Sequence, residues 1–76
     1  MNSNKLKGII KERGKTNKAC AKALGISEFQ FRKKVNGQVG FWLEELAILA
    51  GFLRMTKKEF FDTFTPKVEF MEEEEK

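Results

Sequence analysis

Histidine and tyrosine are absent from this 76-residue chain, and Asp62 is its only aspartate. General acid–base and nucleophilic catalysis depend mainly on side chains of these kinds. The sequence also has no glycine-rich phosphate loop and no pair of carboxylates at a useful spacing. We therefore expect that the protein is not an enzyme.

Cysteine is almost absent as well, because Cys20 stands alone and excludes an intramolecular disulfide. One cysteine without histidine provides no metal site, and Cys20 falls on the apolar side of an expected helix, which favours a core role in a reducing cytoplasm. No run approaches the ~20 apolar residues of a membrane span, and the N-terminus lacks the apolar stretch of a signal peptide. We expect a cytoplasmic protein with no cofactor, no membrane association and no small-molecule ligand.

Charge is distributed unevenly along the chain. Residues 1–43 hold ten of the 15 Lys and Arg residues and two of the 11 acidic residues, a local net charge of +8, whereas residues 44–76 carry −4. Such asymmetry concentrates positive potential on one part of the molecule. A polyanion is the partner that this distribution favours.

Hydrophobic periodicity and capping signals predict an all-α protein with five short helices and no strand. The chain is long enough for one domain, able to bury only roughly 60% of its unfolded surface. Side-chain caps are expected at Asn4 and Thr16, with capping boxes at Ser27 and Thr56. The expected helices cover residues 5–13, 17–24, 28–36, 42–53 and 57–64.

Each expected helix has an apolar side that we assign to the core. The expected inward residues are Leu6, Ile9 and Ile10; Cys20, Ala21 and Leu24; Ile26, Phe31 and Val35; and Leu43, Leu46, Ala47, Ala50 and Leu53. On the fifth helix, Phe60, Phe61 and Phe64 supply apolar bulk.

A tight turn joins the second and third expected helices. Gly25 is the residue type that adopts positive φ at a helix C-terminus without a Cβ clash. Ser27 and Gln30 have the spacing of a capping box for the next helix. Ala21 is small enough to let the two helices approach at the steep angle of a helix-turn-helix. The order and spacing of these signals predict that motif.

The outward side of the third helix carries long hydrogen-bonding side chains together with an aromatic residue. Arg32 and Lys33 have the chemistry to donate to guanine, Glu28 to accept from cytosine and Phe29 to contact a thymine methyl group. Other interpretations stay open. Arg32 and Lys33 could bind phosphates only, Glu28 could serve the helix dipole, and Phe29 could pack on a partner protein.

The chain changes character after Pro66. Residues 67–71 alternate briefly between polar and apolar, which indicates a short extended segment that pairs with a second copy or leans on the domain. Residues 72–75 are all glutamate, typical of a solvated tail, and the alternative is that they compete with DNA for the basic surface. We thus divide the chain into a domain of residues 1–65 and a short, acidic C-terminal tail of residues 66–76.

Residues 4–64 resemble the phage Cro/repressor-type (XRE-like) helix-turn-helix family, in particular the small phage regulators in which one short domain is the whole protein. The resemblance implies a lambda-repressor-like fold of five helices, binding of double-stranded DNA as a homodimer on an operator with twofold character, and transcriptional control. It is carried by Thr16, Ala21, Leu24, Gly25, Ile26, Ser27, Phe31, Val35, Asn36, Gly37, Leu43, Glu44, Glu45, Leu46 and Ala50.

The resemblance also implies which residues contact DNA. Base contacts would come from the exposed start and middle of the third helix, at Glu28, Phe29, Arg32 and Lys33. Backbone contacts would come from the start of the second helix and the loop after the third, at Asn17, Lys18, Asn36 and Gln38.

Four positions depart from the family pattern. Trp42 replaces a polar residue and should leave the fourth helix without a side-chain cap. Asn17 occupies a position where the family commonly has a longer Gln. Cys20 replaces the usual Leu, and Phe29 replaces a small or polar residue.

Together these features predict a sequence-specific DNA-binding regulator, and a repressor that acts by occupying a promoter. Two alternatives remain at this point. The first is a protein–protein module, such as an antirepressor that grips another regulator through Phe29 and Trp42. The second is a basic domain that coats nucleic acid without selecting a sequence.

Overall fold

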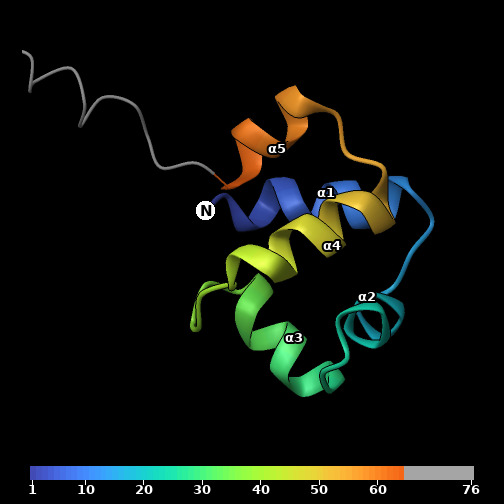
Figure 1. Ribbon diagram of the computed structural model, residues 1–76, viewed down its shortest axis with the longest axis vertical. Helices are drawn as coiled ribbons and strands as arrows, with labels where there is room; N and C mark the ends of the chain where they lie inside the picture. The colour runs from blue at the N-terminus through green and yellow to red at the C-terminus, as the bar shows by residue number, and fades with distance from the viewer. Residues whose placement is uncertain (65–76) are drawn as a thin grey trace, which may run out of the picture.

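The computed structural model describes residues 1–64, which fold into five α-helices without a strand (Figure 1). The expectation of an all-α chain with five helices is confirmed for this part. The tail, with its expected extended segment 67–71 and acidic run 72–75, lies outside the described residues. The helices are α1 (Ser3–Glu12), α2 (Asn17–Leu24), α3 (Glu28–Val35), α4 (Leu43–Leu53) and α5 (Lys57–Phe64).

Helix α1 begins two residues before its expected start, because Asn2 and not Asn4 is its cap. The side chain of Asn2 accepts a hydrogen bond from the Lys5 N–H at 3.0 Å. Its own N–H donates to the carbonyl of Thr63 at 2.7 Å, so α5 holds the cap in place. The expected cap at Thr16 is confirmed, since its hydroxyl accepts from the Ala19 N–H at 3.0 Å.

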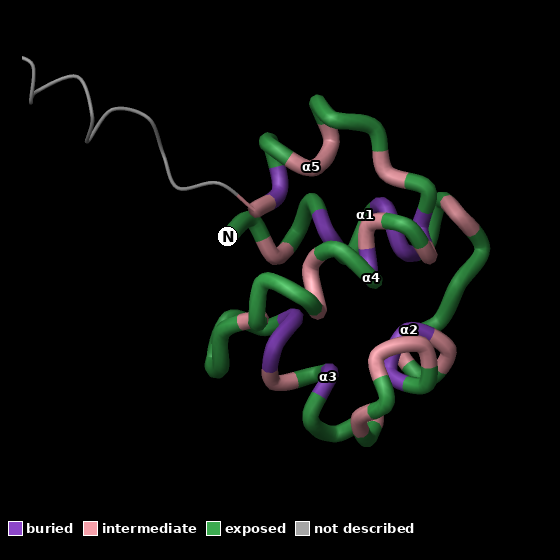
Figure 2. The backbone as a smooth tube through the Cα atoms, viewed as in Figure 1, coloured by how far each residue is buried: buried purple, intermediate pink, exposed green. Residues whose placement is uncertain are grey.

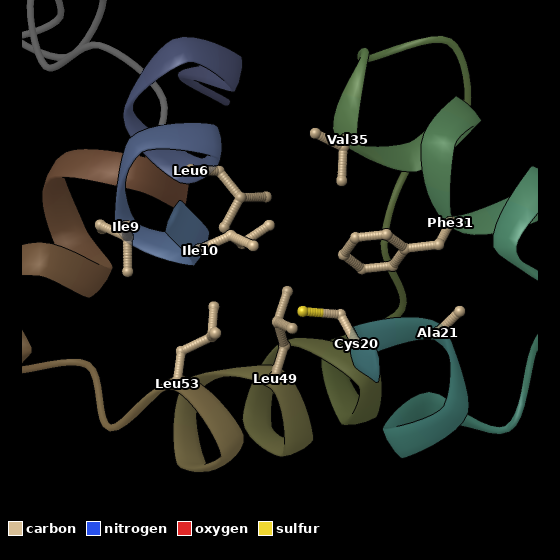
Figure 3. Packing of buried hydrophobic residues seen from close by; sticks show 9 residues of the cluster. All are labelled: Leu6, Ile9, Ile10, Cys20, Ala21, Phe31, Val35, Leu49 and Leu53. Carbon is tan, nitrogen blue, oxygen red and sulfur yellow. The ribbon is translucent and has the colours of Figure 1, made fainter. Parts of the chain in front are cut away.

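The core lies where α1, α2, α3 and α4 converge (Figure 3). The buried positions expected on α1 are confirmed, as are most of those on α2 and α3, while Leu24 and Ile26 are only partly buried against the core. The buried apolar residues are Leu6, Ile9, Ile10, Cys20, Ala21, Phe31, Val35, Leu49 and Leu53.

Helix α4 faces the core with a different side from the one expected. Leu49 is fully buried although it was not among the expected core residues, whereas Leu43 is 78% exposed. Ala47 is also exposed, and Leu46 and Ala50 are half-buried. The expectation was wrong because Glu44 and Glu45 are the only polar residues of this helix, so periodicity selects no face.

Helix α5 is held against α1 by polar contacts and by partial burial of its aromatic residues. Phe60 and Phe64 are half-buried, Phe61 is largely exposed, and Thr63 is the buried residue of this helix. Because Phe61 and Thr63 are two positions apart, they lie on opposite sides of a helix. The contact with the Asn2 N–H then fixes which side of α5 faces α1.

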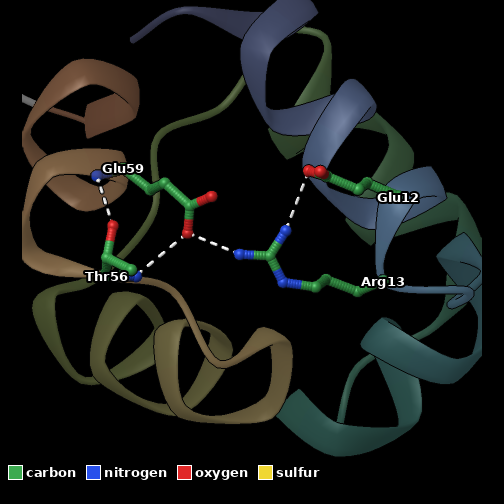
Figure 4. A network of polar contacts seen from close by, with 4 residues as sticks. All are labelled: Glu12, Arg13, Thr56 and Glu59. Atoms are coloured by element: carbon green, nitrogen blue, oxygen red, sulfur yellow. Dashed lines mark hydrogen bonds and ion pairs between the residues drawn. The ribbon is translucent and has the colours of Figure 1, made fainter.

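A short ion-pair network joins the end of α1 to the start of α5 (Figure 4). The Arg13 guanidinium donates to the Glu59 carboxylate at 2.6 Å and to Glu12 at 2.9 Å. Glu59 also accepts from the Thr56 N–H, and the Thr56 hydroxyl accepts from the Glu59 N–H, which confirms the expected capping box. The Arg13 guanidinium, followed by the Thr56 N–H, lowers the pKa of Glu59 below its ordinary value.

None of the helices in residues 1–64 combines the length and apolar character needed to cross a bilayer.

Candidate nucleic-acid interface

The turn between α2 and α3 is built as its sequence predicts. Gly25 adopts the left-handed conformation with φ of 75°, and the Ile26 N–H donates back to the carbonyl of Ala21 at 3.0 Å. Ser27 and Gln30 then form a reciprocal capping box at 3.0 and 3.1 Å. Ala21 is buried, so its small side chain lies where neighbouring elements approach closely. These contacts fix the direction in which α3 leaves the turn.

Helix α3 divides into a buried and an exposed side. Phe31 and Val35 are buried in the core, whereas Phe29 is 66% exposed and Arg32 lies at the surface. Lys33 is half-buried, yet it lies on the same side as Phe29 because four residues separate them. The expected division of this helix is therefore confirmed for Phe29 and Arg32, whereas Lys33 is only partly exposed. Figure 2 shows exposed and buried stretches alternating along α3.

The four residues expected to contact bases form two neighbouring pairs on α3. The Arg32 guanidinium donates to the Glu28 carboxylate at 2.8 Å, and the Lys33 Nζ lies 5.0 Å from the centre of the Phe29 ring. Exposed pairs of these kinds contribute only about 1 kcal/mol or less. Their side chains can therefore exchange these contacts for contacts with a ligand at low cost. The ring also explains why Lys33 is half-buried.

The residues expected to contact the DNA backbone are all accessible to some degree. Lys18, Asn36 and Gln38 are exposed, and Asn17 is half-buried at the start of α2. Among residues 1–64, none of these side chains makes a hydrogen bond or ion pair. Asn17 and Lys18 lie in the first turn of α2, where free N–H groups and the helix dipole attract anions.

Lys34 is one of the ten basic residues of residues 1–43, and the structure shows that it is a buried structural residue. Its side chain is 9% exposed, its Nζ lies 3.0 Å from the Glu45 carboxylate, and it donates to the carbonyl of Gly40 at 2.9 Å. The ammonium group also lies over the ring of Phe41. Lys34 follows Phe31 by three residues and so lies near the buried side of α3, which was a signal for burial. The sequence did not show that Glu45 and Gly40 would be its partners. Lys34 thus ties the end of α3 to the start of α4.

Trp42 precedes α4, and its side chain provides no cap, as expected. The Glu45 carboxylate accepts from the Trp42 N–H at 2.9 Å instead, which satisfies one of the free donors at this helix start. Trp42 is 72% exposed, so it does not anchor the start of α4 in the core.

An open cleft of about 370 Å³ lies beside the loop between α3 and α4. It contains no charged side chain, in contrast to the exposed side of α3. Its lining residues are Met1, Gly37, Val39, Gly40, Phe41, Leu46 and Phe64.

Comparison with protein-family models, with curated proteins and with solved structures finds no match to this chain. The geometry of the site and the sequence are therefore the basis for any functional assignment.

Proposed function

We propose that this chain is a sequence-specific DNA-binding transcriptional regulator with a lambda-repressor-like helix-turn-helix fold. In this proposal α3 enters the major groove of an operator, and the protein acts as a phage-type repressor by occupying a promoter. One observation carries the proposal: Phe29 and Arg32 stand exposed on α3 next to Lys33, while Phe31 and Val35 anchor the opposite side in the core.

The exposed side of α3 offers complementary chemistry for base edges. Arg32 and Glu28 present a donor and an acceptor side by side, which suits guanine and cytosine in the major groove. Phe29 offers an apolar surface for a thymine methyl group, and the Lys33 Nζ lies over that ring beside it. Sequence discrimination would come from these four side chains.

Contacts to the phosphate backbone would position α3 in the groove. Lys18 and Asn17 lie at the N-terminal end of α2, and Asn36 and Gln38 follow α3. Most of the affinity would come from Lys and Arg residues that neutralise phosphates, so binding should weaken steeply as salt rises. On a twofold operator, the half-sites of a dimer should lie about one helical turn apart, roughly 34 Å.

Selection from a pool of random duplexes, run at two salt concentrations, tests the proposal. We expect a consensus with twofold character at both concentrations and weaker retention of all duplexes at the higher one. Retention without a consensus would instead identify a protein that coats nucleic acid. Footprinting at saturation should protect two half-sites, and protection of a single half-site would contradict the proposed dimer.

The exposure of Phe29 and Trp42 favours a second candidate, a protein–protein module that uses the same fold. Aromatic residues are enriched in protein interfaces, and these two are 66% and 72% exposed. Failure to bind any duplex, at low as well as at high salt, would support this candidate over the first.

A further inference from the structure

Helix α4 is apolar around nearly its whole circumference, although only one side of it faces the core. Leu49 and Leu53 are buried, and the opposite side is open to solvent (Figure 2). At about 100° per residue, the open residues fall within an arc of roughly 140°. We call this arc the outer face of α4, and it consists of Leu43, Glu44, Ala47, Ile48 and Gly51.

The outer face differs from the exposed side of an ordinary surface helix. Helix α1 shows the usual pattern, with Lys7 and Lys11 on its exposed side. On α4, the exposed positions include Leu43, which is 78% exposed, and Ile48, which is 47% exposed. A contiguous apolar surface of this kind marks an interaction site.

We propose that the outer face of α4 binds a second copy of this chain, with the two helices antiparallel about a twofold axis at Ala47. Leu43 lies four residues before Ala47 and Gly51 lies four residues after it, so the axis places Leu43 of each copy opposite Gly51 of the other. A Cβ built on Gly51 meets no atom within 4 Å, which leaves space there for a leucine side chain. The surface is therefore complementary to itself.

Charge selects the antiparallel arrangement. Glu44 lies at the start of α4 and Arg54 directly follows its end, and neither makes an ion pair with another residue of 1–64. Antiparallel helices bring Glu44 of each copy towards Arg54 of the other, at both ends of the contact. Parallel helices would bring like charges together, which costs binding energy and disfavours that arrangement.

The size of the outer face sets the strength of the contact. With Leu43 and Ile48 as its only large apolar side chains, the outer face buries well below the ~800 Å² per copy of a standard complex. The dimer should therefore dissociate readily in solution. If the protein binds DNA as proposed, adjacent half-sites on an operator would raise the effective concentration of the two copies and favour the dimer there. This is the one part of the inference that rests on the proposed function.

Oxidative cross-linking of the full chain tests the position of the axis. Helices with interaxial distances of 8–10 Å bring facing Cα atoms to roughly 3.5–5.5 Å, which overlaps the range of a disulfide. We expect Ala47→Cys to form a covalent dimer with at least about tenfold greater yield than the control Gly8→Cys, an exposed site on α1. Native Cys20 is fully buried, so it should not contribute. Equal yields for both variants would overturn the proposal.

Sedimentation equilibrium without DNA provides the second test. Ala47→Glu places two carboxylates at the axis, and the dissociation constant should rise at least about tenfold, whereas Gly8→Glu should leave it unchanged. Glu44→Arg and Arg54→Glu should each weaken the dimer, and their combination should restore it. Circular dichroism confirms that each variant is folded.

Two results of the sedimentation experiment would contradict the proposed interface. One is dimerisation of Ala47→Glu as strong as that of the wild type. The other is a wild-type chain that stays monomeric at every concentration tested. Neither result depends on whether the protein binds DNA, so this test is separate from the test of the proposed function.

Discussion

Lys34→Met should destabilise the fold strongly because Lys34, unlike a surface lysine, is buried beside a carboxylate. The substitution keeps an apolar stem of similar length but removes the charge that lies 3.0 Å from the Glu45 carboxylate. The side chains of Lys34 and Glu45 are only 9% and 14% exposed, and removing one partner of a buried pair costs about 3–5 kcal/mol. Glu45 keeps its contact with the Trp42 N–H, so we expect a loss of about 2–4 kcal/mol.

The measurement is urea unfolding of the full chain followed by circular dichroism, with Lys33→Met as the matched control. Lys33 is the adjacent lysine on α3 and has a ring contact with Phe29 in place of an ion pair, so its replacement should cost about 1 kcal/mol or less. A loss of 2–4 kcal/mol is a large part of the ~4–11 kcal/mol expected for a domain of this size, and it should lower the melting temperature by at least about 10 °C.

The double variant Lys34→Met with Glu45→Gln isolates the pair. Glutamine keeps an acceptor for the Trp42 N–H but carries no charge, so the double variant should be more stable than the sum of the two single losses predicts, by about 1–3 kcal/mol. Equal losses for Lys34→Met and Lys33→Met, or strict additivity in the double variant, would refute the view that Lys34 is a structural residue.

Three further predictions concern other parts of the chain. Lys33→Ala should weaken binding to the preferred duplex by about 1–3 kcal/mol and relax the choice at one base position. Lys18→Ala should weaken binding to all duplexes alike. Fluorescence anisotropy measures both, and equal losses on selected and random duplexes for both variants would contradict this division of roles. Arg13 and Thr56 depress the pKa of Glu59, so the contribution of its carboxylate to stability is complete above the ordinary value of 4.5 and is lost as the pH falls through the lower folded value. Glu59→Gln should therefore flatten this part of a plot of the urea midpoint against pH. An unchanged slope would contradict a stabilising role for the Glu59 carboxylate. Gly25→Ala should lower stability by about 1 kcal/mol because φ is 75° there, and a thermal melt within error of the wild type would show that the turn relaxes.

Much of the local structure could be predicted from the sequence because short-range contacts determine it. The bounds of α2 and α5 match the expectation, and so do the Ser27 and Thr56 capping boxes, since the groups involved are three residues apart in the chain. The start of α1 was missed because Asn2 and Asn4 are both residues that can cap a helix, and the hydrogen bond from the Asn2 N–H to Thr63, at the far end of the described residues, is not visible in the sequence.

The candidate site on α3 was predictable for the same reason. A helix with few apolar residues has only one side that can enter a core, so Phe31 and Val35 determine that Phe29 and Arg32 face outward. The pairing of Arg32 with Glu28 follows from their spacing of four residues. The burial of Lys34 did not follow, because its partners Glu45 and Gly40 belong to other segments.

By itself, the sequence determined the five helices and the side that α3 turns outward, because periodicity and capping act over three or four residues. Only the tertiary structure decided which side of α4 is buried. Almost every side of that helix is apolar, so each was a possible contact with the core. Packing against α1, α2 and α3 selected Leu49 and Leu53, which left Leu43 and Ile48 exposed to solvent.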